Sequence, residues 1–296
     1  MLTPTQGRWL IALAAVLWSL SGAFTKLLTR PTVLGLHEPQ LPVLFIAFCR
    51  VFFAGVALLP TVRPRQVSFR PLMLAMVVTF AAMNALFVTA MAQGTAANAI
   101  LLQYTAPMWM YLASVWWLGE SADRRSTVTL FLGVFGVLVI VWGGRHEAQL
   151  FVVVLGLGSG VTYAGVVVFL RLLRDTSPGW LTVLNHLGGA IALLPALWYL
   201  GLPQPHLEQV AFLAFFGAVQ MGLPYWLMAR GLRVVSPQEA GVITLLEPLL
   251  NPVWAYLVAP ETETPSSFTF LGGALILSGL AWRYWPRKNS RPPLET

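Results

Sequence analysis

One carboxylate lies in the middle of a long apolar stretch of the chain. Glu247 is centred in the segment 238–258, directly before Pro248, and Asn251-Pro252 follows one helical turn later. A charge at membrane depth costs roughly 2.5–3.5 kcal/mol on insertion scales, so such a residue indicates function by default. Each proline also frees a backbone carbonyl, which is tolerated only against protein or a watery cavity. We therefore expect chemistry at Glu247, either proton exchange or contact with a cationic group.

The residues around Glu247 form a polar helix face. Thr244, Glu247, Asn251 and Trp254 are spaced three or four residues apart, so they share one side of a helix. Two interpretations stay open. Glu247 and Asn251 bind substrate, or Glu247 is a fixed hydrogen-bond partner for backbone that a proline has freed.

Arg50 is a second charge inside an apolar stretch, between Phe48-Cys49 and Val51-Phe52. A guanidinium stays charged, so it must face the protein interior and find a partner. It binds a substrate carboxylate, or it holds helices together by pairing with Glu247 or with backbone carbonyls.

Further candidate substrate-binding residues are aromatic, amide or imidazole side chains within apolar stretches. Aromatic rings stack on flat ligands or contact cations, amides specify a ligand or join helices, and a histidine titrates near neutral pH. The set comprises Trp18, Asn84, Gln103, Tyr104, Tyr163, His186 and Gln220. The candidate helix kinks are Pro107, Pro248 and Pro252.

The sequence offers no catalytic residues, metal site or cofactor site. Asp123 and Asp175 are the only aspartates and fall in predicted loops, while the histidines are scattered. The glycine-rich run 156–160 lies inside an apolar segment without a preceding strand, so it is a helix-packing face rather than a nucleotide loop.

Ten apolar segments must position these residues. The chain is 57% hydrophobic and 10% charged, against about 25% charged in ordinary soluble domains. Stretches of about 20 apolar residues are long enough to cross a bilayer as helices. The segments are 9–29, 42–60, 71–92, 97–118, 126–143, 149–170, 178–200, 209–229, 238–258 and 267–285. The predicted fold class is an all-α membrane protein with ten transmembrane helices.

The basic residues predict the orientation of these helices. Most arginines fall in alternate links that share one side, and only Lys26, Arg30 and Arg145 fall on the other. Loops rich in lysine and arginine stay in the cytoplasm, so both termini are expected there. The net charge of +7 is spread over these links and indicates no nucleic-acid partner. We expect a location in the cytoplasmic (inner) membrane of a prokaryote.

Two halves of the chain match one another. The stretch from Ala99 to Pro107 aligns with that from Ala240 to Pro248, and Phe131-Leu132-Gly133 aligns with Phe270-Leu271-Gly272 at nearly the same spacing. This pattern predicts two five-helix repeats, residues 1–146 and 147–296. Because five is odd, the second repeat is inverted in the membrane, and such repeats enclose a central cavity in alternating-access transporters.

Several short motifs recur along the chain in a fixed order and spacing. They are Leu13–Gly22, Arg50, Ala96–Ala99, Tyr104–Pro107 with Leu118–Glu120, and Leu246–Pro248 with Pro260-Glu261. In this order and spacing they resemble the ten-helix EamA type of the drug/metabolite transporter (DMT) superfamily. The resemblance implies secondary transport of small metabolites or drugs, often export, through a cavity lined by both halves. The second half departs from the pattern where Ala259-Pro260-Glu261 replaces Leu118-Gly119-Glu120.

We therefore predict a secondary transporter that exports a small metabolite, amino acid or drug-like compound by alternating access. Its partners are the lipid bilayer, a small-molecule substrate and, as a candidate coupling ion, the proton. The alternatives are a membrane-embedded enzyme acting on a lipid-linked substrate and a nucleotide-sugar carrier. The first needs a catalytic cluster at a membrane face, and the second needs basic residues for phosphates. Substrate identity, coupling and oligomeric state stay open.

Overall fold

The computed structural model describes residues 2–116, 119, 121–143 and 147–285, which are almost entirely helical. The first half contains α1 (Pro4–Ser19), α2 (Ser21–Thr29), α3 (Val43–Leu58), α4 (Pro71–Gln93), α5 (Ala96–Gln103), α6 (Ala106–Trp116) and α7 (Arg124–Gly143). The second half contains α8 (Glu147–Leu172), α9 (Pro178–Leu200), α10 (Leu207–Phe215), α11 (Leu223–Gly231), α12 (Pro237–Thr244), α13 (Leu246–Val258), α14 (Pro260–Glu263) and α15 (Ser267–Tyr284). Short 3-10 turns follow α3 at Leu59–Thr61 and Pro64–Gln66, and η3 (Phe216–Gly222) is a π-helical stretch.

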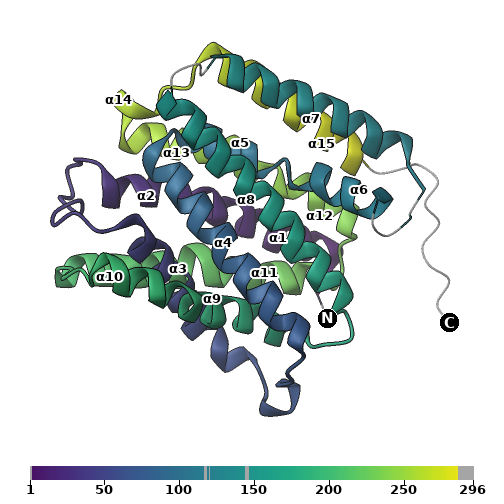
Figure 1. Cartoon of the computed structure of the whole chain (residues 1–296). Coiled ribbons are helices and arrows are strands. Elements are labelled where there is room, and N and C mark those ends of the chain that lie inside the picture. Colours follow the sequence, from purple (N-terminus) through teal and green to yellow (C-terminus); the bar gives the residue numbers. More distant parts are fainter. Residues whose placement is uncertain (1, 117–118, 120, 144–146, 286–296) are drawn as a thin grey trace.

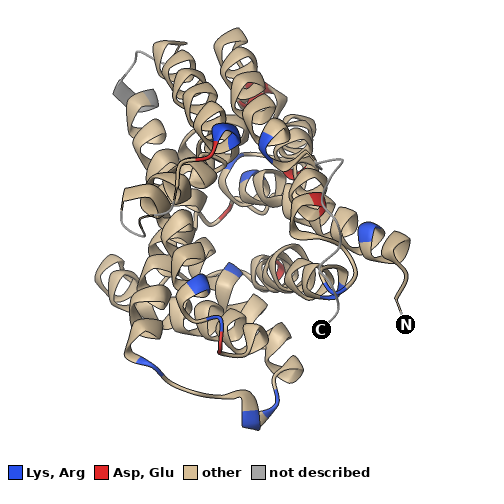
Figure 2. Cartoon of the chain, turned by 90° about the vertical axis from the view of Figure 1, so that its right-hand side faces the viewer, with Lys and Arg blue, Asp and Glu red and all other residues tan. Residues whose placement is uncertain are grey.

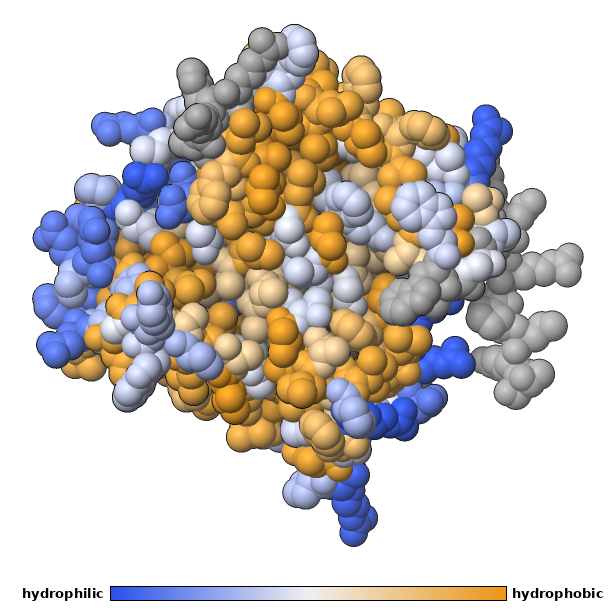
Figure 3. Space-filling model, viewed as in Figure 1, coloured by the Kyte–Doolittle hydropathy of each residue, from blue (hydrophilic) through white to orange (hydrophobic). Residues whose placement is uncertain are grey.

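Eight helical stretches of the described chain are long and apolar enough to cross a membrane, and they coincide with eight of the ten predicted segments. The segment 97–118 is divided between α5 and α6, and α15 covers the tenth segment. Hydrophobic side chains form a broad middle zone on the face in Figure 3, with hydrophilic residues gathered at the left and right. The protein is therefore an all-α membrane protein.

Helices from the two halves are interlaced in four groups (Figure 1). The first core group consists of α1, α11, α12 and α13, and the second core group consists of α4, α5, α6 and α8. Two peripheral pairs are formed by α3 with α9 and by α7 with α15. Figure 2 views many of these helices nearly end-on. Each group combines elements from both halves, so no half forms a separate body.

The α7–α15 pair is held by close backbone contact. A Cβ added at Gly136 would lie 2.6 Å from the carbonyl oxygen of Gly272, and one added at Gly272 would lie 2.5 Å from that of Gly136. Next to this crossing, the hydroxyl of Thr129 donates a 2.8 Å hydrogen bond to the carbonyl of Gly279. Small residues let the helices approach closely, as is typical of packing inside membranes.

Three predicted segments are broken rather than continuous or kinked. The expected kinks at Pro107 and Pro248 are breaks one turn earlier, at Tyr104-Thr105 and at Leu245. Both prolines then lie in the first turn of a new helix, where the missing N–H is not needed. Pro252 lies within α13. The break at Leu20, between α1 and α2, was not predicted.

The segment 209–229 also differs from a regular helix. Residues 216–222 form a π-helical stretch that contains Gln220, a feature that recurs at functional sites. A Cβ added at Gly217 would lie 2.7 Å from the carbonyl oxygen of Arg50, so only glycine lets the backbones of η3 and α3 come this close.

Candidate functional site

Arg50 is the centre of a buried polar network that joins four elements. Its Nε donates to Oε1 of Gln220 at 3.2 Å, and Nη1 donates to Oδ1 of Asn84 at 3.0 Å. Asn84 in turn donates to the carbonyl of Ala47 (2.9 Å), and Gln220 donates to the carbonyl of Trp18 (2.8 Å). Arg50, Asn84 and Gln220 are each at least 95% buried. The structure therefore brings these three predicted site residues together.

Arg50 keeps part of its hydrogen-bonding capacity unused. A guanidinium has five N–H donors, and within the described chain Arg50 uses two of them. Its charge lies 5.7 Å from the ring centre of Phe87 and 5.5 Å from that of Phe216, both cation–π contacts. It forms no salt bridge with any described carboxylate. The predicted alternative of an Arg50–Glu247 pair is therefore wrong for this conformation, although the two charges interact electrostatically through the interior.

Glu247 lies in the first turn of α13, opposite the break between α5 and α6. The hydroxyl of Tyr104, which caps the end of α5, lies 2.8 Å from Oε2 of Glu247. The same hydroxyl lies 3.1 Å from the carbonyl of Thr244, the group that Pro248 deprives of its helical partner. Glu247 is partly exposed, and Oε1 has no partner in the described chain. The carboxylate can therefore accept a further hydrogen bond from a ligand.

The rest of the polar face of α13 packs against the break between α1 and α2. Nδ2 of Asn251 donates to the hydroxyl of Ser21 at 2.8 Å, and Nε1 of Trp254 donates to the hydroxyl of Ser19 at 2.9 Å. Asn251 is completely buried. In this conformation Asn251 joins helices, whereas Glu247, one turn earlier, stays accessible.

His186 is buried within an aromatic cluster. Its ring lies 5.0 Å from that of Phe80 and 5.0 Å from that of Tyr225, and Tyr225 makes an edge contact with Trp18 at 5.2 Å. Nδ1 of His186 lies 2.7 Å from the carbonyl of Thr182, so this nitrogen carries a proton and donates it. Nε2 has no partner in the described chain.

Five side chains from both core groups are polar or aromatic and partly exposed in spite of their position along apolar helices. They are Trp18 and Tyr225 from α1 and α11, Glu247 from α13, and Tyr104 and Tyr163 from α5 and α8. Tyr163 is 39% exposed, and its phenol lies in the same region as Glu247 and Tyr225. Together with Arg50, these residues are called the interior polar site below.

Sequence reasoning missed Tyr225, Ser19 and Ser21. Tyr225 follows Pro224 within an apolar segment, a signal of the same kind that identified Tyr104. The serines gave a weaker signal, because serine in a membrane helix usually bonds to its own backbone. Ser19 does so as well, donating to the carbonyl of Val16 at 2.6 Å. The remaining predicted residue, Gln103, is 7% exposed in α5.

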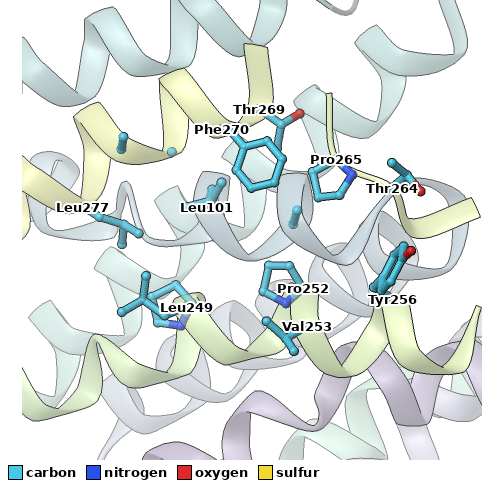
Figure 4. Close-up of a pocket in the computed structure, with 14 residues that line it drawn as sticks. Leu101, Leu249, Pro252, Val253, Tyr256, Thr264, Pro265, Thr269, Phe270 and Leu277 are labelled. Carbon is cyan, nitrogen blue, oxygen red and sulfur yellow. The ribbon is translucent and has the colours of Figure 1, made fainter. Parts of the chain in front are cut away.

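A separate apolar groove of about 580 Å³ lies between α13 and α15, with α5 at its base (Figure 4). Leu249 and Val253 of α13 face Phe270 and Leu277 of α15 across it, and Leu101 lies between them. Its lining is mostly apolar and contains no charged side chain. This groove therefore differs in chemistry from the interior polar site.

No group of three or more histidine, cysteine or acidic residues occurs in the described ranges in an arrangement that could hold a metal ion. Glu120, which belongs to one of the short motifs, lies outside the described residues.

The chain was compared with known proteins. The model of the EamA-like transporter family matches it twice, at residues 5–142 and 150–285. An uncharacterized transporter of Archaeoglobus fulgidus is 30% identical over 244 residues, which cover 81% of this chain and 87% of that protein. The transporter YwfM of Bacillus subtilis is 26% identical over 288 residues, 91% of this chain and 90% of that protein.

A relative with a stated cargo and a solved structure complete the comparison. The pseudopaline exporter CntI of Pseudomonas aeruginosa is 27% identical over 182 residues, 61% of this chain and 63% of that protein. One solved crystal structure has a TM-score of 0.65 and covers 95% of this chain and 98% of its own, at 14% identity, which shows a shared fold. Because the family model matches both halves, the chain belongs to the EamA-like transporter family of the DMT superfamily.

Proposed function

We propose that this transporter moves a small metabolite, amino acid or drug-like compound across the cytoplasmic membrane by alternating access, in the direction of export. One observation carries the proposal: the interior polar site is formed by both core groups, from side chains that apolar helices would otherwise not tolerate. Export is favoured by the resemblance to the pseudopaline exporter.

The residues of the interior polar site suggest complementary roles. Glu247 has an acceptor oxygen without a partner and is suited to an ammonium group or a proton. Arg50 has unused donors and is suited to an acidic group. Trp18, Tyr163 and Tyr225 supply aromatic surface for the body of the substrate. Asn84 and Gln220 hold Arg50 in place.

The proposed mechanism rests on an inverted repeat, residues 1–146 and 147–296, with ten spans in total. The break after α5, at Tyr104, matches the break after α12, at Leu245, in the sequence alignment of the halves. Under the repeat, α1 corresponds to α8, α4 to α10–α11, and α5–α6 to α12–α13. The two core groups are then counterparts of one another, and rocking between them would expose the site to each side in turn.

The ends of the helices fit one orientation. The N-terminal end of α1, the start of α7 and the end of α15 lie at one end of the molecule, and α2 and α14 lie at the other (Figure 1). The first end carries most of the basic links, so we place it in the cytoplasm. The second end is called the outer end below. Family membership implies transport rather than catalysis, which disfavours the enzyme alternative.

Substrate flux in proteoliposomes tests the proposal. A panel of amino acids, acidic metabolites and cationic drugs would be measured with and without a pH gradient. We expect flux of at least one class, abolished or made independent of pH by Glu247→Gln. Glu239→Gln is the matched control, because Glu239 is a partly exposed carboxylate at the start of the same segment, where it pairs with Arg8. Absence of flux under every gradient would overturn the proposal.

A further inference from the structure

A completely buried ion pair closes the outer end of the structure. Nζ of Lys26, in α2, lies 2.5 Å from Oε1 of Glu263, in α14. The side chains of Lys26 and Glu263 are 0% and 1% exposed. Sequence counting assigned Lys26 to the links on this side, whereas the structure places it within α2. Two charges removed from water in this way need further hydrogen bonds to be tolerated.

Those hydrogen bonds reach across to the other core group. Nζ of Lys26 donates to the carbonyl of Gly94 at 2.7 Å, and Oε2 of Glu263 accepts from the backbone N–H of Ala96 at 2.7 Å. Gly94 and Ala96 flank Thr95 in the link between α4 and α5, which belong to the second core group. Lys26 and Glu263 lie in α2 and α14, which continue α1 and α13 of the first core group.

Local structure explains why this link is a good partner. The N–H of Ala96 is one of the donors that a helix leaves unsatisfied at its start, and the N-terminus of α5 favours a negative charge. The Thr95 hydroxyl caps the N–H of Asn98, and the carboxylate of Glu263 accepts from another of these donors, the N–H of Ala96. Gly94 is the residue directly after α4, and its backbone packs against the side chain of Val152.

The outer end has one more contact to α5, and it comes from the α7–α15 pair. The hydroxyl of Thr269, in the first turn of α15, donates to Oδ1 of Asn98 in α5 at 3.0 Å. The cytoplasmic end is different. There Arg8 and Glu239 pair over 2.6 Å with side chains that are 51% and 33% exposed. Arg8 and Glu239 lie in α1 and α12, both in the first core group, and exposed pairs contribute little to stability, so this pair does not join the two core groups.

We propose that the Lys26–Glu263 pair is an outer latch, which holds the first core group against the α4–α5 link and must open whenever the site faces outward. The proposal rests on the alternating-access function proposed above. In the closed latch both charges are satisfied, one by the Gly94 carbonyl and the other by the Ala96 N–H. Separating the core groups would break both backbone hydrogen bonds together and admit water to the ion pair. The pair is therefore either buried with both hydrogen bonds formed or hydrated with both broken.

Distances between spin labels test the latch without any substrate. Cysteines replacing Gln93, at the end of α4, and Glu261, in α14, are exposed label sites on opposite sides of the latch. The background is Cys49→Ala, because Cys49 is the only cysteine in the sequence. We expect one short distance population in the otherwise unaltered protein. The double variant Lys26→Met/Glu263→Gln removes both charges at once, so it leaves no unpaired buried charge, and it should add a second, longer population.

Three comparisons make the test specific. Arg8→Met/Glu239→Gln removes the exposed pair at the other end and should leave the distance unchanged. Glu263→Gln alone keeps the size of the side chain and an acceptor for the Ala96 N–H. It should also give a second population at the longer distance, but a smaller fraction of it than the double variant gives. The reversal Lys26→Glu/Glu263→Lys keeps both charges but aims an acceptor at the Gly94 carbonyl and a donor at the Ala96 N–H, so it should not restore the single short distance.

An unchanged distance in folded Lys26→Met/Glu263→Gln and Glu263→Gln protein would overturn the latch, and so would full restoration by the reversed pair. Folding is checked by gel filtration and thermal unfolding in detergent. The result is independent of the flux measurement. A protein that transports but shows no change in distance disproves only the latch, whereas a protein without flux disproves the transport proposal.

Discussion

Tyr104 and Glu247 connect two of the broken segments, 97–118 and 238–258, through a hydrogen bond of 2.8 Å. Tyr104 ends α5, and Glu247 lies in the first turn of α13, directly after the break at Leu245. The two breaks occupy matched positions in the halves. The hydroxyl that joins them also covers the Thr244 carbonyl, which lies 3.1 Å away.

Removing this hydroxyl should weaken the protein and alter the interior polar site. Tyr104→Phe leaves Glu247 without its described partner, and hydrogen bonds to charged groups contribute about 1.5–3 kcal/mol. We expect a lower midpoint of thermal unfolding and a changed dependence of flux on pH. Tyr111→Phe is the matched control. It removes a hydroxyl that bonds to Thr127 at 2.6 Å, away from Glu247, and should leave the pH dependence of flux intact.

The Arg50 network should require an arginine. A lysine lacks the planar fork that bonds to Asn84 and Gln220 together, so Arg50→Lys should lower the free energy of unfolding. Asn84→Leu removes the partner of one donor and should cost about 1–3 kcal/mol, because a buried polar group loses its bond. Denaturant unfolding in detergent measures both effects. Arg65→Lys, at an exposed position, should leave the free energy of unfolding almost unchanged. Equal losses of stability in Arg50→Lys and Arg65→Lys would contradict the network.

The α7–α15 crossing should not tolerate a side chain at Gly136. An added Cβ there would lie 2.6 Å from the carbonyl oxygen of Gly272, so Gly136→Val must push the helices apart. Overpacking of this kind costs roughly 1–3 kcal/mol. We expect a lower thermal unfolding temperature than for Val134→Leu, a change on the exposed side of the same helix. Equal stability of the two variants would rule out close packing at this crossing.

Asp123 should stabilise the start of α7 in a way that depends on pH. Its Oδ1 accepts hydrogen bonds from the backbone N–H groups of Arg125 (3.0 Å) and Ser126 (3.1 Å). Hydrogen bonds from Ser126 hold the pKa of Asp123 below its usual value. The stabilisation of the folded protein by the Asp123 carboxylate is therefore fully present above the usual carboxylate pKa. It is lost as pH falls through the lower pKa that Asp123 has in the folded state.

Replacing Asp123 tests this cap directly. Asp123→Ala should cost about 1 kcal/mol at neutral pH. The difference in free energy of unfolding between Asp123→Ala and the parent protein should shrink at acidic pH. A difference in free energy of unfolding that stays constant down to low pH would contradict the capping role. Asp175→Ala, a loop aspartate without a described hydrogen bond at a helix start, is the control.

The proposed orientation predicts which loops an impermeant thiol reagent reaches in intact cells. In a Cys49→Ala background, Arg124→Cys should be protected, because the link before α7 is placed in the cytoplasm. Glu261→Cys, at the exposed start of α14, should be labelled. Labelling of Arg124→Cys alone would reverse the orientation and would turn the latch toward the cytoplasm.

The sequence by itself determined the fold class and the family. Apolar segments of membrane-crossing length are a property of composition, and eight of them were recovered as candidate spans. The short motifs resembling the EamA type were confirmed by a family match over both halves. Arg50 and Glu247 could be recognised as interior residues, because a charge deep within an apolar segment is costly when it faces lipid and therefore turns toward the protein interior.

Only the tertiary structure decided how these groups are partnered. Arg50 bonds to Asn84 and Gln220 rather than to Glu247, and Lys26 is buried against Glu263 rather than exposed in a loop. Such pairs join residues far apart in the chain, and their geometry depends on how helices from both halves interlace. Local pattern carries no information about that packing. The sequence therefore shows which groups must find a partner, and the packing of the helices decides which partner each one finds.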